Sequence, residues 1–290
     1  MRRIVERIGL DDDLTLEQRR QRMERPDRLP RPRRVVYDDE QLAGVPIVTA
    51  TPTDVPPVRH VLYLHGGGYC LGSPNSHIGM AARLAKRAGA VAILPDYRLA
   101  PEHEYPAAID DCMRVYRALI DEIDPATLAI AGDSAGGGAA LATLCRLRDA
   151  GDPLPGATYL LSPWTDLTGS GESMTTKGEI DPMLKGPFLH QGAAMYAADT
   201  PLDDPGVSPL FADLAGLPPT LIQTGSDEIL LDDTTRLVER LEAAEVDTTV
   251  EIAEGLWHVY PAFAGFMPEA TAALIRAGTF LRTHLLPTGH

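Results

Sequence analysis

The sequence of 290 residues has little of what marks several classes of protein. It has only three cysteines, Cys70, Cys112 and Cys145, and they form neither a CxxC pair nor a Cys/His ligand pattern. This argues against a disulfide framework and against a structural metal site. No stretch approaches the ~18 apolar residues that span a bilayer, and charges interrupt the amino terminus where a signal peptide would be apolar. We therefore expect a cytoplasmic protein with no membrane span.

Basic side chains are also scarce, since 26 Lys and Arg stand against 41 Asp and Glu, a formal net charge of −15. They concentrate only at 2–7 and 28–34, where acids or prolines interrupt them. Because binding to a phosphate backbone needs clustered Lys and Arg, we expect no nucleic-acid partner. Hydrophobic residues at 44% and charged residues at 23% are typical of a folded globular protein.

From residue 60 onward, short apolar runs alternate with helix-spaced segments. The runs are HVLYLHG, AVAILPDY, LAIAGDS, ATYLLSP, PPTLIQTGSD and TTVEIAEG, and the segments are 76–88, 106–123, 136–149, 232–245 and 268–285. Apolar runs without polar alternation indicate strands buried on both faces, so the pattern predicts an α/β fold with a mainly parallel central sheet flanked by helices. Residues 35–52 predict a hairpin at a sheet edge, turning at Ala43-Gly44.

Two segments break this rhythm. More than fifty residues separate the strand ending near Ser162 from the strand beginning near Pro219, which is too long for a bare loop and indicates an inserted segment with helix. The first ~30 residues are charged and weakly helical in pattern, and resemble an arm rather than core. We divide the chain into an arm (1–45), a core (46–170 and 207–290) and an inserted cap segment (171–206).

The strongest local signal is GDSAG, which fits G-x-S-x-G between an apolar strand and a helix-patterned segment. A serine at such an elbow occupies a strained turn, so Gly132 and Gly136 must be small for the backbone to pass. Ser134 is therefore the candidate nucleophile, and the alternative is an unreactive glycine-rich turn. We expect Asp133, beside it, to hydrogen-bond neighbouring loops. Upstream, the loop His65–Gly68 follows a strand, and its three glycines let backbone N–H groups approach a substrate oxygen.

A serine nucleophile needs a histidine as base and an acid to orient that histidine. On this scaffold the chain order is serine, acid, histidine, and His258 follows the last predicted strand. Asp227 follows the preceding strand and is the favoured acid, with Asp232 and Asp233 as competitors that fall within a helix-patterned stretch. Neither glycine run matches a dinucleotide or phosphate-binding motif, so we expect no cofactor and no metal.

Six motifs occur in order: HGGGY, DYRLAPEHEYPAAIDD, GDSAGG, SPWTDLTGSGES, TGSDEILLDD and GLWHVY. Together, from about residue 55 to 285, they resemble the bacterial hormone-sensitive lipase family (family IV carboxylesterases) of the α/β-hydrolase fold. The resemblance implies Ser134, Asp227 and His258 as the triad, with oxyanion donors from the backbone N–H groups of Gly67, Gly68 and Ala135. It also implies a small helical cap built from the amino-terminal arm and the segment around 171–206.

Other side chains have weaker claims. Trp164, Phe188, Met195 and Tyr196 are candidates to line a substrate pocket, with ordinary core packing as the alternative. We expect Arg98 and Glu102 to pair and pin their loop.

The function that we expect is a serine carboxylesterase that hydrolyses short- to medium-chain acyl esters through an acyl-enzyme. A lactone hydrolase or a small-molecule deacetylase would use the same triad, and a non-catalytic ligand receptor on this scaffold is a remote alternative because His258 is present. The partner is thus a small-molecule ester or lactone. A homodimer is left open.

Overall fold

The computed structural model describes residues 14–24 and 31–287. Parts of the predicted arm, 1–13 and 25–30, lie outside the described residues, and so do the basic cluster at 2–7 and part of the one at 28–34. Where the chain is described, no helix combines the length and the apolar character needed to cross a membrane.

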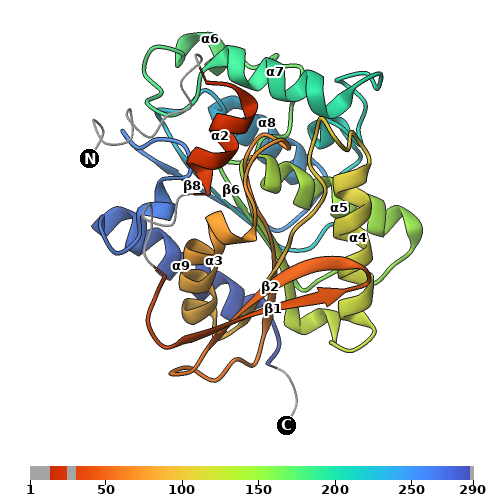
Figure 1. Cartoon of the computed structure of the whole chain (residues 1–290), viewed down its shortest axis with the longest axis vertical. Coiled ribbons are helices and arrows are strands. Elements are labelled where there is room, and N and C mark those ends of the chain that lie inside the picture. The colour runs from red at the N-terminus through yellow and green to blue at the C-terminus, as the bar shows by residue number, and fades with distance from the viewer. Residues whose placement is uncertain (1–13, 25–30, 288–290) are drawn as a thin grey trace.

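An eight-stranded sheet with the order β1-β2-β4-β3-β5-β6-β7-β8 forms the centre of the molecule (Figure 1). The strands are β1 (Val35–Leu42), β2 (Val45–Pro52), β3 (His60–Leu64), β4 (Val91–Pro95), β5 (Leu128–Asp133), β6 (Ala157–Leu161), β7 (Thr220–Gly225) and β8 (Thr248–Ala253). Neighbouring strands from β4 to β8 in this order pair in parallel, whereas β2 is antiparallel to both of its neighbours, β1 and β4. The predicted α/β fold with a mainly parallel sheet is confirmed.

The two antiparallel strands form the hairpin predicted for residues 35–52, at one edge of the sheet. Ala43 and Gly44 connect them with φ values of 50° and 78°. Two consecutive positive φ values are what a two-residue type I′ hairpin turn requires, which explains the glycine at the second position.

Helices cover both faces of the sheet. They are α3 (Pro74–Ala88), α4 (Ala107–Ile120), α5 (Ala135–Ala150), α8 (Leu231–Ala243) and α9 (Pro268–His284). Buried residues of α3 and of the second half of α9 share one core cluster with the sheet, and those of α4, α5 and α8 share another. The first half of α9 packs in a third cluster with Trp257 and Tyr260. The five helices predicted from the apolar spacing are confirmed, with shifts of a few residues at their ends.

The long connection between β6 and β7 carries two helices, α6 (Ser173–Thr176) and α7 (Gly186–Ala197), as its helical pattern predicted. The described part of the arm forms helix α2 (Leu16–Met23), which lies beside these helices at the same end of the molecule (Figure 1). Arg19 joins them, because its guanidinium donates to Gln191 Oε1 at 3.2 Å and lies 5.4 Å from the centre of the Phe188 ring.

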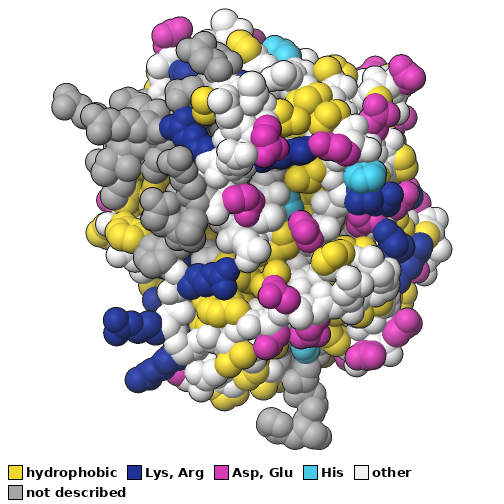
Figure 2. All heavy atoms as spheres, viewed as in Figure 1, with side chains coloured by type: hydrophobic (Ala, Val, Ile, Leu, Met, Phe, Trp, Pro, Cys, Tyr) yellow, Lys and Arg dark blue, Asp and Glu magenta, His cyan; other side chains and the backbone are white. Residues whose placement is uncertain are grey.

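Charged side chains of both signs are spread over the surface. Figure 2 shows Asp and Glu side chains scattered across one face, with Lys and Arg in small separate groups. This distribution agrees with the acidic net charge of the chain.

Candidate active site

Ser134 occupies the sharp turn between β5 and α5, with φ 54° and ψ −124°. A non-glycine residue in this conformation is strained, and the two flanking glycines make room for it. A Cβ on Gly132 would lie 2.2 Å from the carbonyl oxygen of Gly136, and a Cβ on Gly136 would lie 2.1 Å from that of Leu64. Both positions therefore exclude any side chain, as the motif predicted.

The glycine loop lies beside this turn because β3 and β5 are parallel neighbours, with Leu64 paired to Gly132. Gly67 and Gly68 have φ values of 128° and 62°, which favour glycine. Within the described residues, no hydrogen-bond acceptor is found for the backbone N–H groups of Gly67, Gly68 or Ala135. Three unpaired donors next to one serine hydroxyl are suited to binding a negative oxygen.

His258, in the loop after β8, is paired with a glutamate rather than with the predicted aspartate. Its Nδ1 lies 2.8 Å from Glu228 Oε2, and both side chains are buried. The expectation that Asp227 holds His258 is therefore corrected by one residue. The backbone N–H of Asp227 donates to Leu256 O in the turn after β7, and its half-buried side chain is followed by the longer Glu228, which reaches inward to the histidine.

Glu228 is fixed by a set of donors. Its Oε1 accepts from the hydroxyls of Ser162 and Thr224 and from the backbone N–H of Gly225. The Ser162 hydroxyl oxygen in turn accepts from the backbone N–H of Val259 at 3.1 Å, which ties the histidine loop to the carboxylate. The acid is thus anchored to the end of β7 and to the loop after β6, and through Ser162 to the loop that carries His258.

The two competing acids have structural partners. Asp233 is buried and accepts from the backbone N–H groups of Thr165 and Asp166. Asp232 accepts from the backbone N–H of Ser173 at 2.9 Å. Both aspartates hold the segment that follows β6, and neither binds His258.

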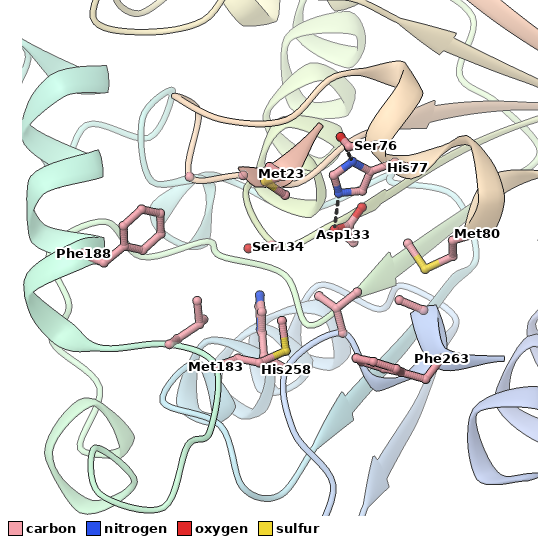
Figure 3. A pocket seen from close by; sticks show the side chains of 15 residues that line it. Met23, Ser76, His77, Met80, Asp133, Ser134, Met183, Phe188, His258 and Phe263 are labelled. Atoms are coloured by element: carbon pink, nitrogen blue, oxygen red, sulfur yellow. Dashed lines mark hydrogen bonds and ion pairs between the residues drawn. The ribbon is translucent and has the colours of Figure 1, made fainter. Parts of the chain in front are cut away.

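The ring of His258 points toward the Ser134 hydroxyl across the cavity (Figure 3). Since an ionised carboxylate only accepts, Nδ1 donates to Glu228 and Nε2 is left as an acceptor on the serine side. Burial acts to lower the pKa of His258, but the hydrogen bond to Glu228 and its negative charge raise the pKa above its ordinary value of 6.5. A neutral histidine with this tautomer can take a proton from the serine.

Ser134 and His258 open into a cavity of about 160 Å³ with a mainly apolar wall. Four lining side chains come from α2 and the inserted segment: Met23, Met183, Leu184 and Phe188. Further apolar lining residues come from the core: Met80, Val259, Ala262 and Phe263. Figure 3 shows Phe188 and Phe263 on opposite sides of Ser134.

Of the four predicted pocket residues, only Phe188 is among the residues that line this cavity. Trp164 and Tyr196 are instead about 1% exposed and contact Tyr69, with Tyr196 stacked on it at 3.7 Å between ring centres. Met195 packs against the same core. The prediction is corrected for these three, because aromatic and Met residues at helical spacing fill a core as readily as they line a pocket.

A second histidine–carboxylate pair lies at the other side of the serine. Asp133 Oδ1 accepts from the Tyr63 hydroxyl at 2.7 Å and from the backbone N–H of Gly66 at 3.2 Å, and its Oδ2 lies 3.3 Å from Nε2 of His77. The expectation that Asp133 bonds to neighbouring loops is confirmed. His77, which comes from the start of α3 and lines the cavity, was not predicted, because no recognisable motif surrounds it.

The predicted pair of Arg98 and Glu102 is wrong. Arg98 makes a forked interaction with Asp111 on α4, whereas Glu102 accepts two hydrogen bonds from Arg20 of α2, each 2.7 Å long. Arg20 also donates to the carbonyl of Cys70, at the end of the glycine loop. The amino-terminal helix is therefore tied to the loop that carries the unpaired N–H groups.

A family model described as the alpha/beta hydrolase fold matches residues 61–262. A solved esterase from the bacterial hormone-sensitive lipase family is 38% identical, covers 98% of this chain and 96% of its own, and superposes with a TM-score of 0.94. The chain belongs to this family of α/β-hydrolases. The enzyme class that goes with the family is carboxylic ester hydrolase, in agreement with the sequence-based expectation.

Two curated relatives of this hormone-sensitive lipase family member have similar lengths. An "Acetyl-hydrolase" from Streptomyces hygroscopicus is 42% identical over 87% of this chain and 89% of its own length. An "Esterase" from Acinetobacter venetianus is 42% identical over 76% of this chain and 73% of its own. The similarity thus covers most of each protein.

Proposed function

We propose that the protein hydrolyses short- to medium-chain acyl esters by way of an acyl-enzyme, with Ser134 as nucleophile and His258 as base. Glu228 orients His258, and the N–H groups of Gly67, Gly68 and Ala135 bind the oxyanion. The observation that carries this proposal is the bond between His258 and Glu228, with the ring of His258 turned toward Ser134 and three unpaired backbone donors beside that serine. In the same proposal, α2 and residues 171–206 form the cap that encloses the acyl or alcohol group.

In the first half of the reaction, Ser134 Oγ attacks the ester carbonyl carbon while Nε2 of His258 takes the hydroxyl proton. The carbonyl oxygen becomes an oxyanion, and each backbone donor that binds it lowers the barrier by about 3 kcal/mol. The ester C–O bond then breaks, and His258 gives its proton to the leaving alcohol. Glu228 stabilises the positive charge that His258 carries between these two steps.

In the second half, a water molecule attacks the acyl carbon and His258 takes one of its protons. The new tetrahedral intermediate collapses, its bond to Ser134 Oγ breaks, and His258 returns the proton to the serine. The carboxylic acid leaves, and the enzyme is regenerated.

Acetyl esters are the second candidate substrate class. The relative named "Acetyl-hydrolase" is 42% identical, and the cavity of about 160 Å³ is small. A series of p-nitrophenyl esters from acetate to octanoate distinguishes the two: a deacetylase loses kcat/KM steadily beyond acetate, whereas an esterase for medium chains has its maximum at a longer acyl group.

The deciding experiment compares wild type with Ser134→Ala on p-nitrophenyl butyrate, and labels both with a fluorophosphonate. We expect the wild type to be labelled and active, and the variant to be unlabelled and at least about 10³-fold slower. Near-normal hydrolysis by the variant would refute the assignment of the nucleophile. A folded wild type that neither reacts with the label nor turns over esters would favour the ligand-receptor alternative.

A further inference from the structure

His77 has both of its ring nitrogens occupied, and the pattern of its hydrogen bonds favours the charged form of the ring. Nδ1 lies 2.9 Å from Ser76 Oγ and Nε2 lies 3.3 Å from Asp133 Oδ2 (Figure 3). The single hydroxyl proton of Ser76 is donated to the carbonyl of Ser73 at 2.9 Å, and the same oxygen accepts from the Ser73 N–H. With the hydroxyl proton in this bond, Nδ1 donates to Ser76, and the Ser73 carbonyl raises the pKa of His77, in agreement with a proton on this side of the ring.

The other ring nitrogen must donate as well, because the partner is a carboxylate that can only accept. With a proton on each nitrogen, His77 is an imidazolium, and it forms a buried ion pair with Asp133. Burial acts to lower the pKa of His77, but the charge and hydrogen bond of Asp133 raise it above the ordinary value. The pKa of the neighbouring His65 is lowered to about 3, first by its own burial and then by His77.

Asp133 connects this cation to the catalytic groups. It directly precedes Ser134, and its Oδ1 accepts from the N–H of Gly66, at the start of the glycine loop. The loop packs tightly on the carboxylate, since a Cβ on Gly66 would lie 2.3 Å from Asp133 Oδ2. The orientation of one carboxylate therefore sets the distance between the nucleophile and the loop that would bind the oxyanion.

We propose that His77 is a positioning residue for ester hydrolysis: as an imidazolium it holds Asp133 in the orientation that fixes the glycine loop against Ser134. The inference rests on the proposed function. It assigns His77 no contact with the reacting atoms, and its effect passes through Asp133 to Gly66. A misplaced oxyanion loop slows the chemical step without weakening substrate binding, so the effect falls on kcat rather than on KM.

Two isosteric variants separate the two bonds of His77. The amide of His77→Gln can replace Nε2 and still donate to Asp133, whereas that of His77→Asn replaces Nδ1 and keeps only the bond to Ser76. We expect kcat for p-nitrophenyl butyrate to fall about 10- to 100-fold in His77→Asn, with KM unchanged, and only a few-fold in His77→Gln. His284→Gln, at the end of α9, is the matched control and should behave as wild type.

A pH profile gives a second readout. The groups that face His77 are Asp133 on β5, His65 after β3 and Glu24 after α2, with Ser76 on its own helix and His258 across the cavity. As pH rises through the His77 pKa, the imidazolium is lost and the wild-type kcat should fall. The glutamine of His77→Gln cannot titrate, so the kcat of this variant should not fall at high pH.

The outcomes are distinct. If His77→Asn keeps the wild-type kcat, or if His77→Gln is the more damaged variant, the inference is overturned and His77 serves only the cap of α3. If thermal unfolding shows that His77→Asn does not fold, the pH profile of His77→Gln decides. A fall in kcat at high pH that is unchanged from wild type would also overturn the inference. If the wild type itself shows no Ser134-dependent hydrolysis, the proposed function fails instead.

Discussion

Two buried histidine–carboxylate pairs flank Ser134, and both histidines line one cavity, yet the pairs are built differently. His258 with Glu228 and His77 with Asp133 each have a histidine whose pKa is raised by its partner despite burial. In the described structure, Nε2 of His258 has no hydrogen-bond partner and faces the serine. Both nitrogens of His77 are bound.

The difference lies in whether each histidine ring can accept a proton from the serine. A histidine acts as a base only if one nitrogen holds an available lone pair, and a carboxylate on the other nitrogen keeps it available. His77 has no such nitrogen, so below its pKa its positive charge holds Asp133 and takes no part in proton transfer. Proximity to a serine and a raised pKa are therefore insufficient to identify a base, and the hydrogen-bond partners decide.

The sharpest test of the His258 pair is Glu228→Gln beside Asp227→Asn. The amide cannot accept from Nδ1 in the same way and favours the wrong tautomer, so we expect kcat/KM for p-nitrophenyl butyrate to fall about 10³- to 10⁴-fold. Asp227→Asn should stay within about threefold of wild type, since Glu228 already occupies Nδ1.

Thermal unfolding of both variants shows whether the loss is catalytic. A strong loss of kcat/KM in Asp227→Asn, with an active Glu228→Gln, would show that Asp227 is the acid after all. The His258–Glu228 pair would then have no catalytic role to compare with that of His77 and Asp133.

The pH dependence gives the next largest effect. His258 must be neutral to accept a proton, and its pKa is raised above 6.5, so kcat/KM should fall about tenfold per pH unit below a midpoint that lies above 6.5. In Glu228→Gln, the hydrogen bond and the charge that contribute most to raising the His258 pKa are gone, while burial and the weaker effects of Asp181 and Asp133 remain, so the residual activity should have its midpoint at lower pH. A midpoint that does not move would contradict the role of Glu228.

Ser162→Ala tests the hydroxyl that joins Glu228 to the histidine loop. The variant loses one hydrogen bond to the carboxylate and leaves the Val259 N–H unpaired, which should cost about 1–3 kcal/mol of stability. We expect kcat to fall about tenfold. Ser226→Ala is the matched control, because its hydroxyl accepts from Gly255 in an adjacent turn. Equal kcat values for the two variants would show that Ser162 does not help to position Glu228 for catalysis.

The smallest effect is expected at Tyr63→Phe, on the other pair. Asp133 loses the donor at 2.7 Å but keeps His77 and Gly66, so kcat should fall only about two- to fivefold. The acid limb of the pH profile should not move. Tyr116→Phe on the remote helix α4, where the hydroxyl donates to Pro153 O, controls for the general loss of a tyrosine hydroxyl. A shifted acid limb in Tyr63→Phe would show that the two pairs are coupled.

Most of the fold is predictable because the strands buried on both faces, β3 to β7, leave an unmistakable apolar pattern. The expectation of burial on both faces was wrong for β8, which lies at the sheet edge and is partly exposed. The six parallel strands and the hairpin at Ala43-Gly44 each follow from local residues. The elbow at Ser134 is predictable for the same reason, since its glycines are fixed by steric contacts within a few residues and against the neighbouring strand.

The acid and the pocket depend on long-range geometry instead. Asp227 and Glu228 are adjacent, and which carboxylate turns inward depends on the path of the turn after β7. The cavity wall draws Met23 and Phe188 from segments that only the tertiary structure brings together. Likewise, the partner of Glu102 is Arg20, 82 residues away, and no local pattern points to it.

The backbone of Ser134 has a consequence for the stability of the whole protein. A serine held at φ 54° destabilises the folded state by about 1–3 kcal/mol, and glycine at the same place would be relieved of that strain. The inactive Ser134→Gly protein should therefore be at least as heat-resistant as the active one. Selection for thermal stability alone, without selection for turnover, would tend to replace the serine that we propose as nucleophile.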